Sequence, residues 1–147
     1  MRRAILVALG IGAVITSAAA LGIGVAALAE SKSLAREHYD AAMAGIESAR
    51  ADWLARCDDA KGNEKELCRA QVGAAEMIRV ADLEASYRRT QDSARNAQRA
   101  RVEARYQLER AACAALGGLK RDRCLIGAHA TRGRALLEAA APYETRS

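Results

Sequence analysis

Apolar side chains recur at alternating steps of four and three residues through much of the chain, which is the spacing of one face of an α-helix. The first such segment begins after Ser31 or Ser33, either of which can cap a helix. A second segment covers about residues 64–88, and the last follows residue 118 and ends before Pro142. The first segment predicts a seam in which Trp53 belongs to the core. Its members are Ala35, Tyr39, Ala42, Ile46, Ala49, Trp53 and Cys57.

Two glycine-containing stretches predict turns between antiparallel helices. After Cys57 the apolar pattern stops, and Gly62 suits the left-handed conformation that ends a helix. Asn63, with Glu66 three residues later, predicts the N-cap of the next helix. The pair Gly117 and Gly118 supplies a second turn.

The polar stretch 88–93 interrupts the pattern without a glycine or a proline. Thr90 or Asp92 can cap a new helix there, but nothing in the stretch enforces a break. We therefore expect an all-α fold of three to four long helices. Whether the middle two form one rod over about residues 64–116 stays open.

The second half of the chain repeats the first at an offset of 56 residues. The residues Cys57, Gly62 and Cys68 fall on Cys113, Gly118 and Cys124. Identity at both cysteines and at the turn glycine is more than a periodic helix gives by chance. We therefore expect two tandem helical hairpins, at residues 30–88 and 89–147, that arose by duplication of one hairpin.

Residues 1–29 have the pattern of an export segment. Arg2 and Arg3 precede an uncharged run over residues 4–29, and small residues at 18–20 offer a cleavage site. As one helix this run would be about 39 Å long, enough to cross a hydrocarbon core of about 30 Å. We expect a periplasmic protein. The alternative is an inner-membrane anchor, with membrane contact through residues 4–29 and the helices outside the cytoplasm.

Export makes the four cysteines candidates for disulfide bonds. Cys57 and Cys68 flank the first turn and Cys113 and Cys124 flank the second, so local bonds would clamp each hairpin. If each pair instead lay on one continuous helix, Cys57 would bond to Cys124 and Cys68 to Cys113. The glycines midway within each pair favour the local bonds. With no Phe and one Trp the core is thin, and each clamp would contribute about 3 kcal/mol by restricting the unfolded chain.

The charged residues mostly predict a solvated surface. The formal net charge is +5, and residues of both signs are interspersed along the expected helices. An arginine-rich stretch between the hairpins is nevertheless a candidate for binding a polyanion or a membrane surface. Its members are Arg88, Arg89, Arg95, Arg99, Arg101 and Arg105. They do not share one helical stripe, and we expect no nucleic-acid partner.

No group of residues predicts catalysis, a metal site or a cofactor. The cysteine spacing lacks the short half-sites of zinc proteins, and no glycine-rich phosphate loop occurs outside the export segment. His38 and His129 are single histidines that we expect on helix surfaces or seams. Asp58 and Asp59 lie at a helix end and predict a solvated terminus. We therefore expect a protein that is not an enzyme and that has no catalytic residues, metal or cofactor.

The first cysteine element carries a resemblance to a known family. Its residues are Cys57, Asp58, Gly62, Asn63, Lys65 and Cys68, preceded by Ile46 and Glu47. It resembles a family of small exported alanine-rich helical proteins of Gram-negative bacteria, in which C-D-x-x-x-G-N-x-K-x-x-C tends to occur twice. The chain departs from the family's pattern at Arg50, where the family has an aromatic residue. It also departs at Ala114 and Leu119, where the family has Asp and Asn.

The resemblance implies a periplasmic location and a paired-hairpin shape, and it implies no chemistry. We therefore expect a structural or protein-interaction role in the cell envelope. The partner would be an envelope protein or a second copy of the chain.

Overall fold

Residues 19–140 form four α-helices joined by short turns, and this described part contains no strand. The computed structural model describes the backbone of residues 19–140 and the side chains of residues 35–140. The helices are α1 (Ala19–Cys57), α2 (Gly62–Arg88), α3 (Gln91–Ala114) and α4 (Gly118–Ala140). The expected all-α fold is confirmed.

The chain divides into two compact units between Leu34 and Ala35. The first unit is described only through the backbone of α1 from Ala19 onward, and residues 1–18 of the predicted export segment lie outside the described residues. Within the described range, no helix combines the length and the apolar character that a membrane crossing requires. The second unit holds residues 35–88 of the first predicted hairpin and residues 89–140 of the second, which therefore belong to one packed body.

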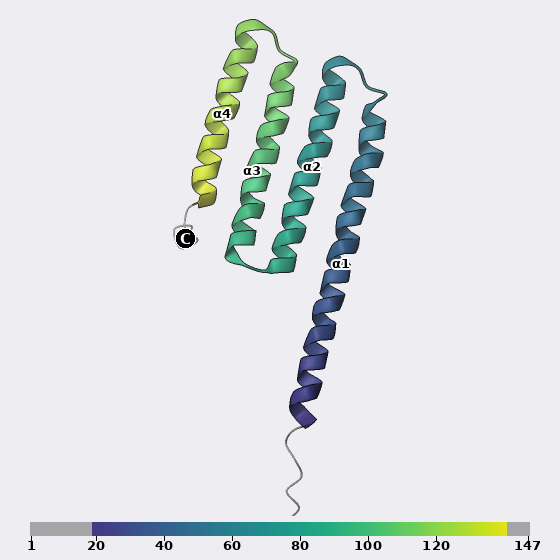
Figure 1. Ribbon diagram of the computed structural model, residues 1–147. Helices are drawn as coiled ribbons and strands as arrows, with labels where there is room; N and C mark the ends of the chain where they lie inside the picture. The colour runs from purple at the N-terminus through teal and green to yellow at the C-terminus, as the bar shows by residue number, and fades with distance from the viewer. Residues whose placement is uncertain (1–18, 141–147) are drawn as a thin grey trace, which may run out of the picture. The chain divides into compact units, whose positions relative to one another are not determined.

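In this second unit the helices lie side by side in sequence order and alternate in direction (Figure 1). α2 packs against α3 and α3 packs against α4, whereas α2 and α4 do not contact each other. α1 is joined to α2 by a disulfide, by the Arg50–Glu76 ion pair of 2.7 Å, and by Tyr39 and Tyr87, whose ring centroids are 4.6 Å apart. The helices thus form an open layer with α1 and α4 at its edges.

The interior of this layer is built mainly from small side chains. Ala74 on α2 and Ala97 and Ala104 on α3 are buried, and Ala104 has no exposed surface. The largest side chains that are fully buried are Cys57 and Cys113. Because alanine lets helix backbones approach closely and contributes little apolar area, the core is thin and its stability depends on other links.

The two hairpin turns have the same backbone form. Gly62 and Gly118, the first residues of α2 and α4, have φ of 55° and 51°. In this left-handed region glycine pays no Cβ penalty. Asn63 is the second residue of α2 and the cap position is Lys61, which makes no side-chain cap bond. The prediction that Asn63 caps α2 is therefore wrong, because Gly62 already makes the change of direction.

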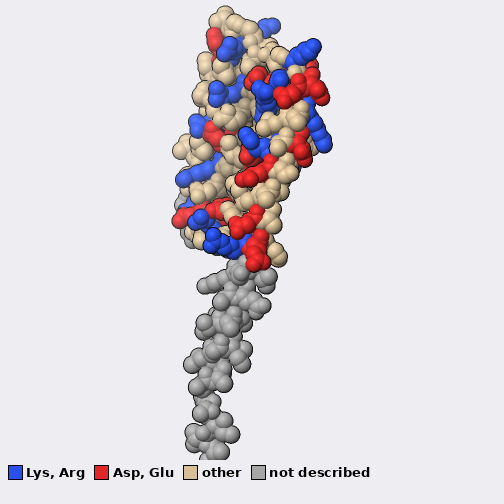
Figure 2. Space-filling view, turned by 45° about the vertical axis from the view of Figure 1, so that its right-hand side comes forward, with Lys and Arg blue, Asp and Glu red and all other residues tan. Residues whose placement is uncertain are grey.

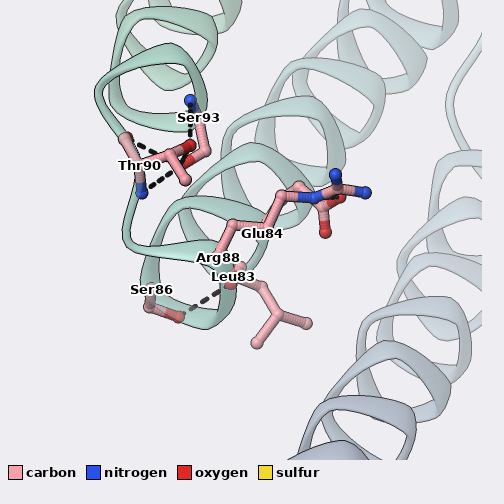
Figure 3. A network of polar contacts seen from close by, with 6 residues as sticks. All are labelled: Leu83, Glu84, Ser86, Arg88, Thr90 and Ser93. Carbon is pink, nitrogen blue, oxygen red and sulfur yellow. Dashed lines mark hydrogen bonds and ion pairs between the residues drawn. The ribbon is translucent and has the colours of Figure 1, made fainter.

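α2 and α3 are separate helices, so the middle two predicted helices do not form one rod. α2 ends at Arg88, and Arg89 follows in the left-handed region with φ 51° and donates its N–H to the Ala85 carbonyl at 3.0 Å. Thr90 then caps α3: its Oγ1 accepts the Ser93 N–H at 3.1 Å, and Ser93 Oγ accepts the Thr90 N–H at 3.1 Å (Figure 3). This reciprocal capping box starts a new helix in the opposite direction.

Candidate functional site

Each hairpin is closed by its own disulfide. Cys57 is bonded to Cys68 and Cys113 to Cys124, with a Cα–Cα distance of 5.6 Å in both. The local pairing expected from the turn glycines is confirmed, and the alternative in which the pairs cross between hairpins is excluded. No cysteine in the described part of the chain is free.

Asp58 adds a charged link beside the first clamp. Its Oδ1 lies 2.9 Å from Lys65 Nζ and 3.2 Å from Arg69 Nη2, both on α2. The hydrogen bond and the charge of Lys65, followed by those of Arg69, lower the pKa of the Asp58 carboxyl below its ordinary value. In the second hairpin Ala114 occupies the equivalent position, so that turn lacks this link.

At the end of the first hairpin that lies away from the Cys57–Cys68 disulfide, a second polar link joins α1 to α2. Tyr39 on α1 donates a hydrogen bond to the Glu84 carboxylate on α2, which raises the pKa of Tyr39. The pKa of Glu84 is lowered, first by its bond to Arg88 and then by that from Tyr39. The Arg88 Nε–Glu84 Oε1 distance is 2.5 Å, and Figure 3 shows this pair next to the turn into α3.

A groove of about 270 Å³ runs between α1 and α2. Ile46 and Val72 are among its apolar lining residues, and the Arg50–Glu76 ion pair contributes its polar part. Trp53 also lines the groove but is 50% exposed, so its expected place in the core is wrong. In a single layer no further helix covers this side of α1, and the indole remains in contact with water.

A polar cluster lies between α3 and α4. Tyr106 is 7% exposed, and its hydroxyl lies 3.2 and 3.0 Å from the two ring nitrogens of His129. Arg132 donates from Nε to Glu103 Oε2 at 2.6 Å, and its guanidinium carbon lies 4.9 Å from the Tyr106 ring centroid. These contacts orient Tyr106 from two sides, by a hydrogen bond and by a cation–π contact.

Sequence reasoning missed this cluster because its residues belong to no motif. The signal that could have found it is the clamp itself, since Tyr106 lies seven residues before Cys113 and His129 five residues after Cys124. A disulfide between antiparallel helices fixes which residues face each other further along the hairpin.

A hollow of about 370 Å³ opens beside this cluster. Its lining carries two guanidinium groups, an imidazole and a phenol, and contains no carboxylate. The lining residues are Tyr106, Arg110, Ala114, Arg121, Leu125 and His129. Such a set of donors can accept an oxyanion by charge and hydrogen bonding.

Five of the six arginines predicted as an anion-binding stretch are bonded to other groups of the chain. Four of them already form ion pairs with carboxylates, at distances of 2.5 to 3.3 Å. These pairs are Arg88–Glu84, Arg95–Asp92, Arg101–Asp82 and Arg105–Glu109. Arg89 donates to the Ser86 carbonyl, and Arg99 has no carboxylate partner within residues 35–140. Figure 2 shows basic and acidic side chains interspersed on the face that it draws.

Among residues 35–140, no three His, Cys, Asp or Glu side chains are close enough to hold a metal ion. His38 is exposed on α1, and His129 is exposed and bonded to Tyr106.

Comparison of the chain with protein-family models, with curated proteins and with solved structures finds no match.

Proposed function

We propose that the chain is a non-enzymatic exported protein of the cell envelope that acts by binding another protein through its helix faces. The observation that carries the proposal is the open layer, which leaves large apolar side chains in water. These are Trp53, Tyr87, Leu116, Leu119, Ile126 and Leu137. Exposed apolar surface of this kind is typical of protein interaction sites.

The disulfides support export. Bonds of this kind persist in oxidising compartments and are rare in the cytosol. The charged start and uncharged run of residues 1–29, together with the resemblance at the first cysteine element, favour the periplasm. A layer with a thin core would depend on its two clamps there, since an oxidising compartment keeps them closed.

A photo-reactive amino acid placed at position 53 tests the interaction role in cells that make the protein. We expect an adduct with an envelope protein, because Trp53 lies half exposed at an apolar groove. Ala51, an exposed residue of the same helix, is the matched control position. Equal adduct yields at positions 51 and 53, or none at either, would contradict a specific role for the groove.

One observation favours binding of a small anion as a second candidate function. The hollow beside Tyr106 has only neutral or cationic polar groups in its lining. Titration with inorganic phosphate, followed by NMR, should shift the signals of His129 and its neighbours. Arg121→Gln should abolish these shifts and Arg99→Gln should leave them unchanged. Shifts spread evenly over the surface arginines would reject the hollow as a site.

A further inference from the structure

The outward face of α4 carries a continuous apolar seam. Its positions alternate in steps of four and three residues, and all of them are exposed. Arg123 is the one polar member, and the others are Leu119, Ile126, Ala130, Gly133, Leu137 and Ala140. The exposed fractions of Leu119, Ile126 and Leu137 are 74%, 69% and 75%.

This seam lies on the side of α4 that faces away from α3. Cys124, bonded to α3, and the buried Ala128 define the inward side. With 3.6 residues per turn, Ala130 and Leu137 lie about half a turn around the helix from Ala128. The apolar spacing of the outward side is that of a helix seam made to contact another helix.

From this arrangement we infer that the seam binds the α4 seam of a second copy of the chain, in an antiparallel two-fold pair. The inference rests on the proposed interaction role and names one of its partners. It differs from the Trp53 groove, which lies on α1 and α2 and stays open in such a dimer.

The seam is self-complementary in one antiparallel register. With Ala130 opposite Ala130 of the second copy, Ile126 comes within one residue of the level of Gly133 and Leu119 within one residue of the level of Ala140, an offset of about 1.5 Å along the helix. Each large side chain therefore meets a small one, which lets the helices approach closely without an overlap. Arg123 comes opposite Leu137, where its aliphatic stem can cover the leucine while the guanidinium stays in water. A two-fold contact requires this kind of self-matching surface.

Gly133 is a second indication of close approach. A glycine within an exposed helix costs about 1 kcal/mol relative to alanine. A Cβ at this position would meet nothing within 4 Å in the chain itself. The packing of this chain therefore gives no reason for glycine there, whereas Ile126 of a second copy would occupy that space.

The pair also continues the packing of the layer. α2 with α3 and α3 with α4 are antiparallel neighbours, and each of these three helices carries at least one buried alanine. α4 is an edge helix (Figure 1). An antiparallel α4 from a second copy would therefore extend the layer with the same antiparallel packing of neighbouring helices. α4 has 23 residues and is about 35 Å long. One helix of this length is a small interface, so the dimer is reversible and depends on concentration.

Self-association measured by analytical ultracentrifugation of the disulfide-bonded chain over a concentration series tests the dimer. We expect a monomer–dimer equilibrium that Ile126→Lys weakens by roughly tenfold or more, a change of about 1.4 kcal/mol. The position is exposed, so the variant should keep the wild-type circular dichroism spectrum. Ala94→Lys, at an exposed site on α3, is the control and should associate as wild type does. A wild-type chain that stays monomeric throughout, or equal weakening by both variants, would overturn the inference.

Single added cysteines test the register. Ala130→Cys should form a disulfide-linked dimer, because the two copies of position 130 face each other. Arg123→Cys should not, because its two copies lie about 21 Å apart along the antiparallel pair, beyond disulfide reach. Cross-linking of both variants would show a parallel pair and would contradict the inference, as would cross-linking of neither. Either result leaves the Trp53 adduct experiment intact, so failure of the dimer is distinguishable from failure of the interaction role.

Discussion

Arg89 is the one non-glycine residue with a positive φ in the described part of the chain. A left-handed conformation costs a residue with a Cβ roughly 1–2 kcal/mol. This cost falls where α2 ends and α3 begins, and the hydrogen bond from Arg89 Nε to the Ser86 carbonyl at 3.3 Å offsets part of it. The bend is therefore held mainly by the capping box at Thr90 and Ser93.

Replacing Arg89 by glycine should stabilise the fold. We expect Arg89→Gly to raise the free energy of unfolding by about 0.5–1 kcal/mol, because glycine adopts this conformation without the Cβ penalty. Arg99→Gly, within α3, is the control and should lower it by about 1 kcal/mol. Urea unfolding followed by circular dichroism measures both. A loss of stability in Arg89→Gly would show that the Ser86 bond outweighs the backbone cost.

Asp58 should make stability depend on pH in the acid range. Its pKa is lowered in the folded chain from an ordinary value of 3.8, so the charged form favours folding. This contribution is present above the unfolded pKa and is lost as the pH falls through the folded pKa. Asp58→Asn should therefore show a shallower loss of stability on acidification than the wild type.

Asp59→Asn is the matched control for the pH experiment. Asp59 is the neighbouring carboxylate, and the ion pairs found among residues 35–140 do not include it. The measurement is the urea midpoint as a function of pH for the three chains. If Asp59→Asn reduces the loss of stability at low pH as much as Asp58→Asn does, the ion pair between Asp58 and Lys65 is not the cause of the pH dependence.

At the scale of the elements, the clamps set the register of each hairpin. Counting outward from Cys57–Cys68 brings Arg50 within one residue of Glu76 and Tyr39 within one residue of Tyr87, and these pairs are in contact. The apolar pattern and the turn glycines were sufficient to predict the all-α fold and the two local disulfides, because Cys and Gly have few alternative roles at such spacing. The expected start of the first helix after Ser31 or Ser33 is wrong, since α1 begins at Ala19 and continues through both serines. The break at Arg89 could not be predicted with the same certainty, since no glycine marks it.

The α2–α3 contact should be intolerant of larger side chains. Ala104 has no exposed surface, so Ala104→Leu should lower the free energy of unfolding by about 1–3 kcal/mol through overpacking. Ala94→Leu, at an exposed site of the same helix, should change it little. Thermal unfolding of the two variants compares the sites directly. Equal stability of both would mean that α2 and α3 separate easily to accept the leucine.

At the scale of the whole molecule, the helices of the second unit pack against their neighbours in sequence, and α2 and α4 do not close the layer into a bundle. The sequence could not predict this arrangement, because the same amphipathic spacing also suits a closed bundle in which Trp53 would be covered. In the observed layer α2 and α4 do not contact each other, and Trp53 is half exposed. The sites missed by sequence reasoning, the Tyr106–His129 cluster and the outward seam of α4, both depend on which face of a helix remains free.

The measurement that tests the central claim most directly is peptide mapping of the protein taken from the cell envelope, with and without reduction. Arg56, Lys61, Lys65 and Arg69 flank the first cysteine pair, so trypsin releases a distinct cross-linked peptide if the clamp is closed. We expect Cys57 joined to Cys68 and Cys113 joined to Cys124 in the unreduced sample. Free thiols at these positions in the native envelope would contradict an exported protein whose thin helical layer is held by two disulfides.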